Sequence, residues 1–243
     1  MGRILGPDFH PRPGPVVTTV LAFALLFGLG TWQVKRLSWK THLIETIDAR
    51  AHAEPVPLPA SNIDIDAWVY RRVQVTGRFL HDREVHMLAR RPGDQLGYDV
   101  FTPLVRSSGP AVMVNRGWIP ATAKDPAART EGQVEGVVTI VGIVRKPWPK
   151  PWFAPDNNLR TNVWFTPDLA AMARVVGVPL ARVFIEADAT PNPGGLPVGG
   201  QTRLELRNDH LQYAITWYLL AIAVVVIFII YHRTPRDDDG KVG

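Results

Sequence analysis

Cysteine is absent from the 243-residue sequence. Disulfide bonds and thiolate metal sites are therefore excluded, and the fold must be held together without them. Methionine is also scarce, since the chain contains only four, at positions 1, 87, 113 and 172. A copper carrier normally uses Cys or clustered Met and His ligands, so copper binding of the usual kind is not expected.

Signatures of catalysis are missing as well. The sequence contains no Gly-x-Ser-x-Gly, His-Glu-x-x-His or P-loop motif, so we expect a protein that is not an enzyme. The formal net charge is +5, but no dense basic run occurs. Nucleic acid is therefore not an expected partner, whereas a slight cationic excess suits contact with anionic membrane lipid.

Two long apolar runs are the most prominent features that are present. A bilayer core of about 30 Å requires about 20 helical residues, and we predict transmembrane helices at residues 15–33 and 210–231. A cleaved signal peptide is the alternative for the first run. That run begins behind several prolines and no small-x-small cleavage site follows it, so we expect an uncleaved anchor.

Two spans place both termini on one side of the membrane. We expect cytoplasmic tails at residues 1–14 and 232–243 and one periplasmic domain at residues 34–209. Basic residues flank both sides of the first span, so charge marks this orientation only weakly. No Arg- and Ser-rich presequence precedes the first span, which favours the inner membrane of a bacterium over an imported organelle protein.

The hydrophobic pattern predicts a β-rich domain between the spans. Residues 33–51 look like a helical extension of the first span, and alternation with a period of two then predicts strands. The predicted strands are residues 73–79, 84–90, 97–105, 111–119, 134–145 and 183–187. The strand at 134–145 is apolar on both faces and is expected to be central. One helix is predicted, with Thr166 as its N-cap and Gly177 at its end.

These elements define the expected fold class. We predict a membrane protein with two transmembrane α-helices flanking one β-rich, antiparallel α+β extramembrane domain.

The candidate functional residues lie at the start of the second span. Asn208 or Asp209 can cap this helix, which places His210 in its first turn. Tyr213 and Trp217 share a helical face with His210, and Trp217 lies about 10 Å further along the axis. Imidazole above an aromatic wall suits a ligand for metal or haem iron. An ordinary interfacial histidine among the aromatic residues of the membrane boundary is the alternative.

The end of the first span faces the same membrane boundary. Ala24 and Gly28 have the small-x-x-x-small spacing that lets helices approach closely, so Trp32 could lie near Trp217. Two separate interfacial tryptophans with no shared ligand are the alternative.

Arginine and the remaining histidines give weaker signals. Arg203 and Arg207 precede the second span, and arginine pairs well with carboxylates such as haem propionates. Lipid headgroup contact or simple solubility is the alternative for each. The other histidines show no metal-site spacing, and we expect His81 and His86 to lie on the surface.

Several segments together resemble one known family. From the first span to the second, the chain is similar to bacterial members of the Surfeit locus protein 1 family, assembly factors for cytochrome c oxidase. The matching segments are residues 29–36 (LGTWQVKR), 70–79 (YRRVQVTGRF), 97–104 (GYDVFTPL), 114–120 (VNRGWIP), 193–197 (PGGLP) and 208–218 (NDHLQYAITWY). Each is weak alone, but their order and spacing make the resemblance specific.

The resemblance implies a haem-handling role. It implies two spans, an outer-side domain and participation in supplying haem a to oxidase subunit I, with haem a synthase as the expected donor. In bacterial relatives a histidine in the Asn-x-His-Leu-x-Tyr-Ala segment is tied to haem binding, which implies His210 as the iron ligand here. The candidate wall and propionate residues are then Tyr213, Trp217, Trp32, Arg203 and Arg207. A haem-free scaffold that stabilises the nascent subunit, docking through residues 148–153, is the alternative function.

Overall fold

The computed structural model describes residues 11–91, 95–202, 204 and 206–233. Contacts divide the chain into two compact units. One is a helical unit, of which residues 11–45 and 206–233 are described, and the other is a domain, of which residues 46–91, 95–202 and 204 are described.

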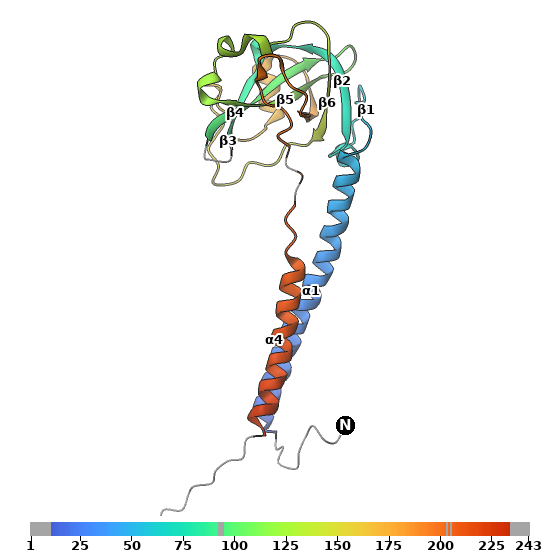
Figure 1. The fold of residues 1–243 in the computed structure, drawn as a ribbon, viewed down its shortest axis with the longest axis vertical. Helices are drawn as coiled ribbons and strands as arrows, with labels where there is room; N and C mark the ends of the chain where they lie inside the picture. Colours follow the sequence, from blue (N-terminus) through green and yellow to red (C-terminus); the bar gives the residue numbers. More distant parts are fainter. Residues whose placement is uncertain (1–10, 92–94, 203, 205, 234–243) are drawn as a thin grey trace, which may run out of the picture. The chain divides into compact units, whose positions relative to one another are not determined.

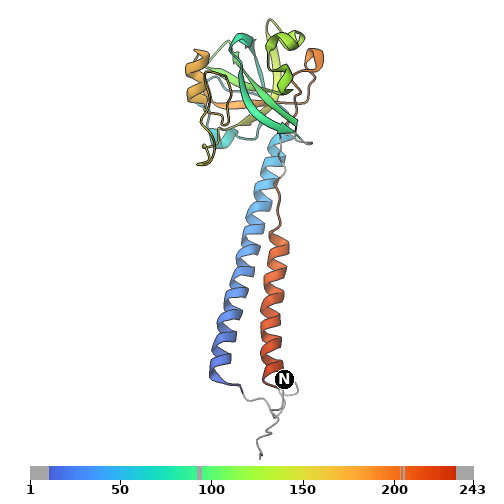
Figure 2. The same cartoon turned by 90° about the vertical axis from the view of Figure 1, so that its left-hand side faces the viewer.

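The helical unit consists of two long helices that lie side by side in opposite directions (Figures 1 and 2). Helix α1 spans Pro13–Ala51 without a break, which confirms the predicted extension beyond the first apolar run. Helix α4 spans His210–Tyr231. Both helices are long and apolar enough to cross a membrane. The chain is therefore a membrane protein with two candidate spans.

The domain is built on one curved sheet of seven strands (Figure 1). Its strands are β1 (Val56–Pro57), β2 (Arg72–Phe79), β3 (Val85–Arg91), β4 (Gln95–Val105), β5 (Ala111–Pro120), β6 (Val138–Arg145) and β7 (Leu180–Ala187). Their order is β1-β2-β6-β7-β5-β4-β3, and a further pairing of β2 with β4 closes the sheet. Strand β6 lies between β2 and β7, so its predicted central place is confirmed.

The sheet is mixed in direction. Neighbours such as β2–β6, β4–β5 and β6–β7 are antiparallel as predicted, but β5–β7 and the short pair β1–β2 run parallel. The parallel β5–β7 pair arises because the chain passes through β6 and a helix before it returns beside β5. A parallel pair of this kind needs a long crossover connection, which local alternation alone does not reveal.

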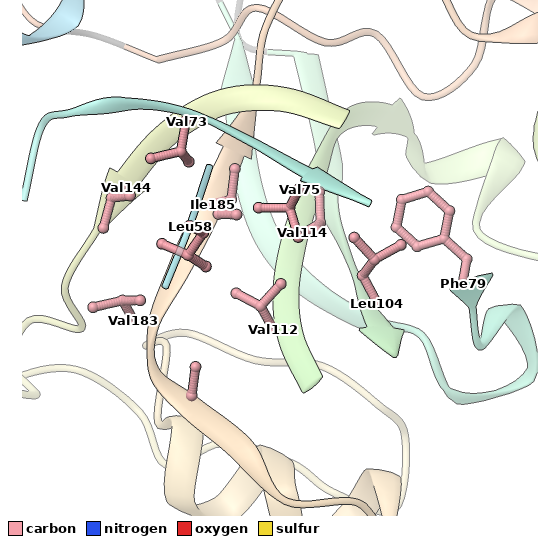
Figure 3. Close-up of a cluster of buried hydrophobic side chains, with 11 residues drawn as sticks. Leu58, Val73, Val75, Phe79, Leu104, Val112, Val114, Val144, Val183 and Ile185 are labelled. Atoms are coloured by element: carbon pink, nitrogen blue, oxygen red, sulfur yellow. The ribbon is translucent and has the colours of Figure 1, made fainter. Parts of the chain in front are cut away.

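Alternating side chains fill the interior of the closed sheet (Figure 3). In β2, Val73, Val75 and Phe79 are buried, whereas Gln74 and Thr76 face outward. The core residues that Figure 3 labels are Leu58, Val73, Val75, Phe79, Leu104, Val112, Val114, Val144, Val183 and Ile185. The alternation predicted from sequence is therefore the inside–outside pattern of the sheet.

Helix α3 (Leu169–Val176) covers a second hydrophobic cluster, and a short helix α2 (Ile65–Trp68) precedes β2. The N-cap of α3 is Asp168 rather than the predicted Thr166. Asp168 Oδ1 accepts a hydrogen bond of 2.9 Å from the Ala171 N–H, while Thr166 is buried. A carboxylate at this position also interacts favourably with the positive N-terminal end of the helix dipole. Gly177 ends the helix as predicted, in a left-handed conformation with φ of 68°.

Candidate functional site

His210 is the first residue of α4 and is joined directly to α1. Its Nδ1 lies 2.7 Å from Oε1 of Gln33. A side-chain amide oxygen can only accept a hydrogen bond, so in a neutral imidazole this contact places the proton on Nδ1 and the lone pair on Nε2. The geometry therefore leaves one ring nitrogen engaged and the other chemically suited to bind a metal.

The aromatic residues below His210 differ in their environment. Tyr213 is 54% exposed, and Trp217 is half-buried. The small residue between them, Ala214, is buried. Within the helical unit, Tyr213 and Trp217 thus retain aromatic surface that a flat ligand could cover, whereas Ala214 serves helix packing.

The close approach of the two helices occurs at Gly30, not at the predicted Ala24 and Gly28. A Cβ added at Gly30 would lie 2.7 Å from Cε1 of Tyr218, whereas one added at Gly28 would meet nothing within 4 Å. Ala24 and Gly28 are both exposed. The predicted face was wrong because small-residue spacing marks a possible contact but does not fix the rotation of the helix.

Tyr218 is the main partner of α1 at this level. Its ring centroid lies 5.4 Å from that of Phe27, and its hydroxyl is 3.2 Å from Oγ1 of Thr31. Trp32 is 54% exposed, and within the two described helices no aromatic ring pair joins it to Trp217. Tyr218, which the sequence did not indicate, therefore supplies an aromatic contact with α1 at this level, and the proximity of the two tryptophans stays a prediction.

This contact leads to a matched pair of substitutions. Gly30→Leu is expected to force α4 away from α1, because overpacking of this kind costs about 1–3 kcal/mol. Gly28→Leu makes the same chemical change toward open space and is expected to leave the helix pair unchanged. Since the chain has no native cysteine, spin labels on cysteines introduced at the exposed positions Val20 and Ile227 can report the helix separation. Equal distances in both variants would contradict the packing described.

The residues that lead into α4 are held by polar contacts. Lys40 donates to the carbonyl of Arg207, and Asn208 Nδ2 donates to Thr41 Oγ1 at 3.3 Å. Asp209 occupies the N-cap position without a side-chain capping bond and instead pairs with Arg207. These contacts bind the segment before His210 to α1 at residues 40 and 41. Tyr218 contacts α1 nearer its N-terminus.

Of the two candidate arginines for propionate binding, the structure describes Arg207 alone. The side chain of Arg207 is 88% exposed, and its guanidinium pairs with Asp209. Arg203 lies outside the described residues. Arg207 therefore offers an accessible cation next to the start of α4, with part of its charge already balanced.

A second concentration of titratable groups lies inside the domain. His86 is buried, and its Nε2 lies 2.9 Å from Glu84 Oε1, while Arg129 forms a bidentate pair with Glu84 through Nη1 at 3.1 Å and through Nη2. Burial alone raises the pKa of Glu84, but the hydrogen bonds from His86 and Arg129 outweigh it and hold this pKa below its ordinary value. The surface placement expected for His86 was wrong, because the carboxylate and guanidinium that satisfy it come from distant segments.

The neighbouring His81 and Arg116 belong to the same region. Arg116 is 2% exposed, and burial lowers its pKa to about 10. It donates to the neutral acceptors Gly132 O and Asn192 Oδ1, and Nη1 lies 3.4 Å from His81 Nδ1. Burial and the nearby guanidinium lower the pKa of His81, against an opposing hydrogen bond to a backbone carbonyl. His81 is half-buried rather than on the surface. These buried groups satisfy one another, which indicates a structural role.

Sequence reasoning missed Gln33 and Tyr218. Gln33 shares the less exposed side of α1 with Leu26, Gly30 and Leu37 at helical spacing, but only the structure shows which side of the helix is covered. A polar residue on the packed side of an apolar helix predicts a polar partner on its neighbour.

The site can supply one imidazole to a metal-containing ligand. In the part of the chain that the structure describes, no group of three or more His, Cys, Asp or Glu side chains is placed to hold a metal ion. A porphyrin provides four nitrogen ligands itself, so a single histidine suffices to fix haem iron. The available donor set therefore fits haem better than a bare metal ion.

Comparison with known proteins identifies related chains. The profile of the SURF1 family matches residues 20–222. Over 213 residues the chain is 42% identical to Surfeit locus protein 1 of Homo sapiens, covering 81% of this chain and 70% of the human protein. It is 40% identical to Surfeit locus protein 1 of Takifugu rubripes over 216 residues, covering 82% of this chain and 89% of that protein. A SURF1-like protein of Drosophila melanogaster is 38% identical over 218 residues, with 82% and 71% covered.

Proposed function

The chain belongs to the SURF1 family of cytochrome c oxidase assembly factors, and from this premise we propose that it binds haem a and assists its delivery to oxidase subunit I. The observation that carries the proposal is the contact of 2.7 Å between Nδ1 of His210 and Oε1 of Gln33, because a neutral imidazole that donates through Nδ1 has its lone pair on Nε2. The role is one of binding and transfer, without chemistry on the haem.

The residues that would hold haem a lie around the start of α4. His210 is the proposed axial ligand, because neutral imidazole is a strong ligand for haem iron. Tyr213, Trp217 and Trp32 keep aromatic surface that could contact the apolar ring. Arg207, and Arg203 outside the described residues, are the candidates for pairing with propionates.

Location and partners follow from the same proposal. We place the two helices in the inner membrane of a bacterium, with both termini in the cytoplasm and the central domain in the periplasm. Haem a synthase would donate the haem and subunit I would receive it, with membrane lipid surrounding α1 and α4. The two apolar helices support membrane insertion, and a site at the end of α4 would lie at the membrane boundary where such a transfer between membrane proteins is simplest.

The proposal is tested by the haem content of the purified chain. We expect the full chain, co-expressed with haem a synthesis and purified in mild detergent, to carry haem a that is visible in its absorption spectrum. Extraction into alkaline pyridine identifies the haem type. A chain that is folded and free of haem under these conditions would overturn the proposed haem binding.

A haem-free scaffold is the second candidate function. It is favoured by one observation, the exposure of Trp152 at 94% and of Phe153 at 74% in the loop between β6 and α3. Exposed large apolar side chains of this kind are typical of protein contact surfaces. A haem-free chain that still captures subunit I, and loses it when Trp152 and Phe153 are both changed to serine, would support this function instead.

A further inference from the structure

The hydrogen bond between His210 and Gln33 joins two helices through residues that are 177 positions apart in the chain. We propose that Gln33 is a positioning residue, which fixes the tautomer and ring orientation of His210 so that Nε2 faces its ligand unprotonated. The inference rests on the proposed haem function, and it assigns to α1 a part in the site beyond membrane anchoring.

The chemistry of the two groups sets the direction of the bond. Oε1 of Gln33 has lone pairs and no proton, so a contact of 2.7 Å requires the proton to lie on Nδ1 of His210. A neutral imidazole with this proton has its lone pair on Nε2. Metal-binding histidines usually donate their other N–H to an oxygen acceptor, which orients the ring and raises its basicity.

Contacts on both sides hold Gln33 at the level of His210. Further along α1, Lys40 and Thr41 bond to Arg207 and Asn208 immediately before α4. In the other direction, Gly30 admits the ring of Tyr218. These contacts fix the register of the two helices, so Gln33 and His210 are held at the same level by more than their own bond.

The opposite orientation of the Gln33 amide would have the opposite effect. If its NH₂ group donated to Nδ1, the proton of a neutral ring would lie on Nε2, and that nitrogen could not bind iron. Two substitutions separate these cases. Gln33→Glu keeps an acceptor and removes the donor, whereas Gln33→Leu removes both with little change in size.

The first measurement is the affinity of the full chain for haem a, titrated in detergent and followed by absorption. Loss of an outer partner of a metal ligand typically weakens metal binding by about 10–100-fold, so we expect this loss for Gln33→Leu. Gln33→Glu should show no such loss, since it preserves the acceptor. Gln212→Leu is the matched control, because it makes the same change at an exposed position of α4 two residues from His210.

The second measurement needs no haem. With ¹⁵N-labelled histidine, nuclear magnetic resonance identifies which ring nitrogen of His210 carries the proton, and His210→Ala assigns the signal. We expect the proton on Nδ1 in wild type and a shift toward Nε2 in Gln33→Leu.

The outcomes distinguish the inference from the proposed function. Weakened haem binding in Gln33→Leu, retained binding in Gln33→Glu and a proton on Nδ1 in wild type support both. Haem binding that is lost in His210→Ala but unchanged in Gln33→Leu overturns the positioning role alone. A proton on Nε2 in the wild-type chain also overturns it. A proton on Nδ1 in a chain that binds no haem a overturns the haem function and, with it, the purpose assigned to Gln33.

Discussion

His210→Ala is expected to yield a folded chain that no longer retains haem a through purification. In the proposed site the imidazole nitrogen provides the bond to the haem iron. Its removal leaves only contacts to the porphyrin ring and its propionates. Removal of an outer partner of a metal ligand weakens binding by about 10–100-fold, and the loss of haem affinity in His210→Ala should be larger than that. The measurement is the ratio of haem absorbance to protein after purification from cells that make haem a.

His52→Ala is the matched control for this loss. The side chain of His52 is 72% exposed and lies at the other end of α1 from the first apolar residues. The same substitution there should leave the haem content unchanged. A His210→Ala chain with the wild-type spectrum and haem content would remove His210 as the ligand.

Arg129→Met is expected to lower the free energy of unfolding of the domain by about 3–5 kcal/mol, because it breaks a buried ion pair by removing one partner. The side chains of Arg129 and Glu84 are 1% and 4% exposed. The substitution leaves the Glu84 carboxylate buried with His86 as its remaining side-chain partner among those described. Unfolding of the full chain by urea in detergent, followed by its tryptophan fluorescence, to which the buried Trp164 contributes, measures the effect.

Two further variants establish the cause. Arg78→Met removes an exposed arginine from β2 and should change the free energy of unfolding by no more than about 0.5 kcal/mol. Combining Glu84→Met with Arg129→Met removes both charges and should recover part of the loss, since no isolated charge then remains buried. A double variant less stable than Arg129→Met alone would contradict the electrostatic explanation.

Periodicity predicted much of the fold, for a physical reason. A strand in a closed sheet buries every second side chain, and β2 shows that pattern through Val73, Val75 and Phe79. The long helix α1 was likewise readable, because its apolar run is followed by a stretch with helical spacing and without proline up to residue 51. Local patterns of this kind record burial, which each segment encodes by itself.

Pairings between distant segments could not be predicted in the same way. His86 looked like a surface residue because its neighbours in the chain do not reveal Arg129, which lies 43 positions away. The parallel pairing of β5 with β7 depends on how the intervening chain crosses back. Both are tertiary choices that no local window contains.

The candidate site likewise has one residue that the local sequence indicates and one that only the tertiary structure reveals. His210 stood out in the sequence because an ionisable residue at a membrane boundary is costly. Gln33 did not, because its importance depends on which face of α1 meets α4. The rotation that brings Gln33 to His210 also brings Gly30 to Tyr218, so one helix contact explains both the missed residue and the wrong small-residue face.

The central claim is that the iron of haem a binds to the imidazole of His210. The most direct test uses His210→Gly, in which free imidazole can occupy the space that the side chain leaves. The absorption spectrum of the purified chain with haem a is recorded for wild type and for His210→Gly, with and without added imidazole. We predict that His210→Gly loses the wild-type spectrum and that imidazole restores it; a wild-type spectrum in His210→Gly without imidazole would contradict the account.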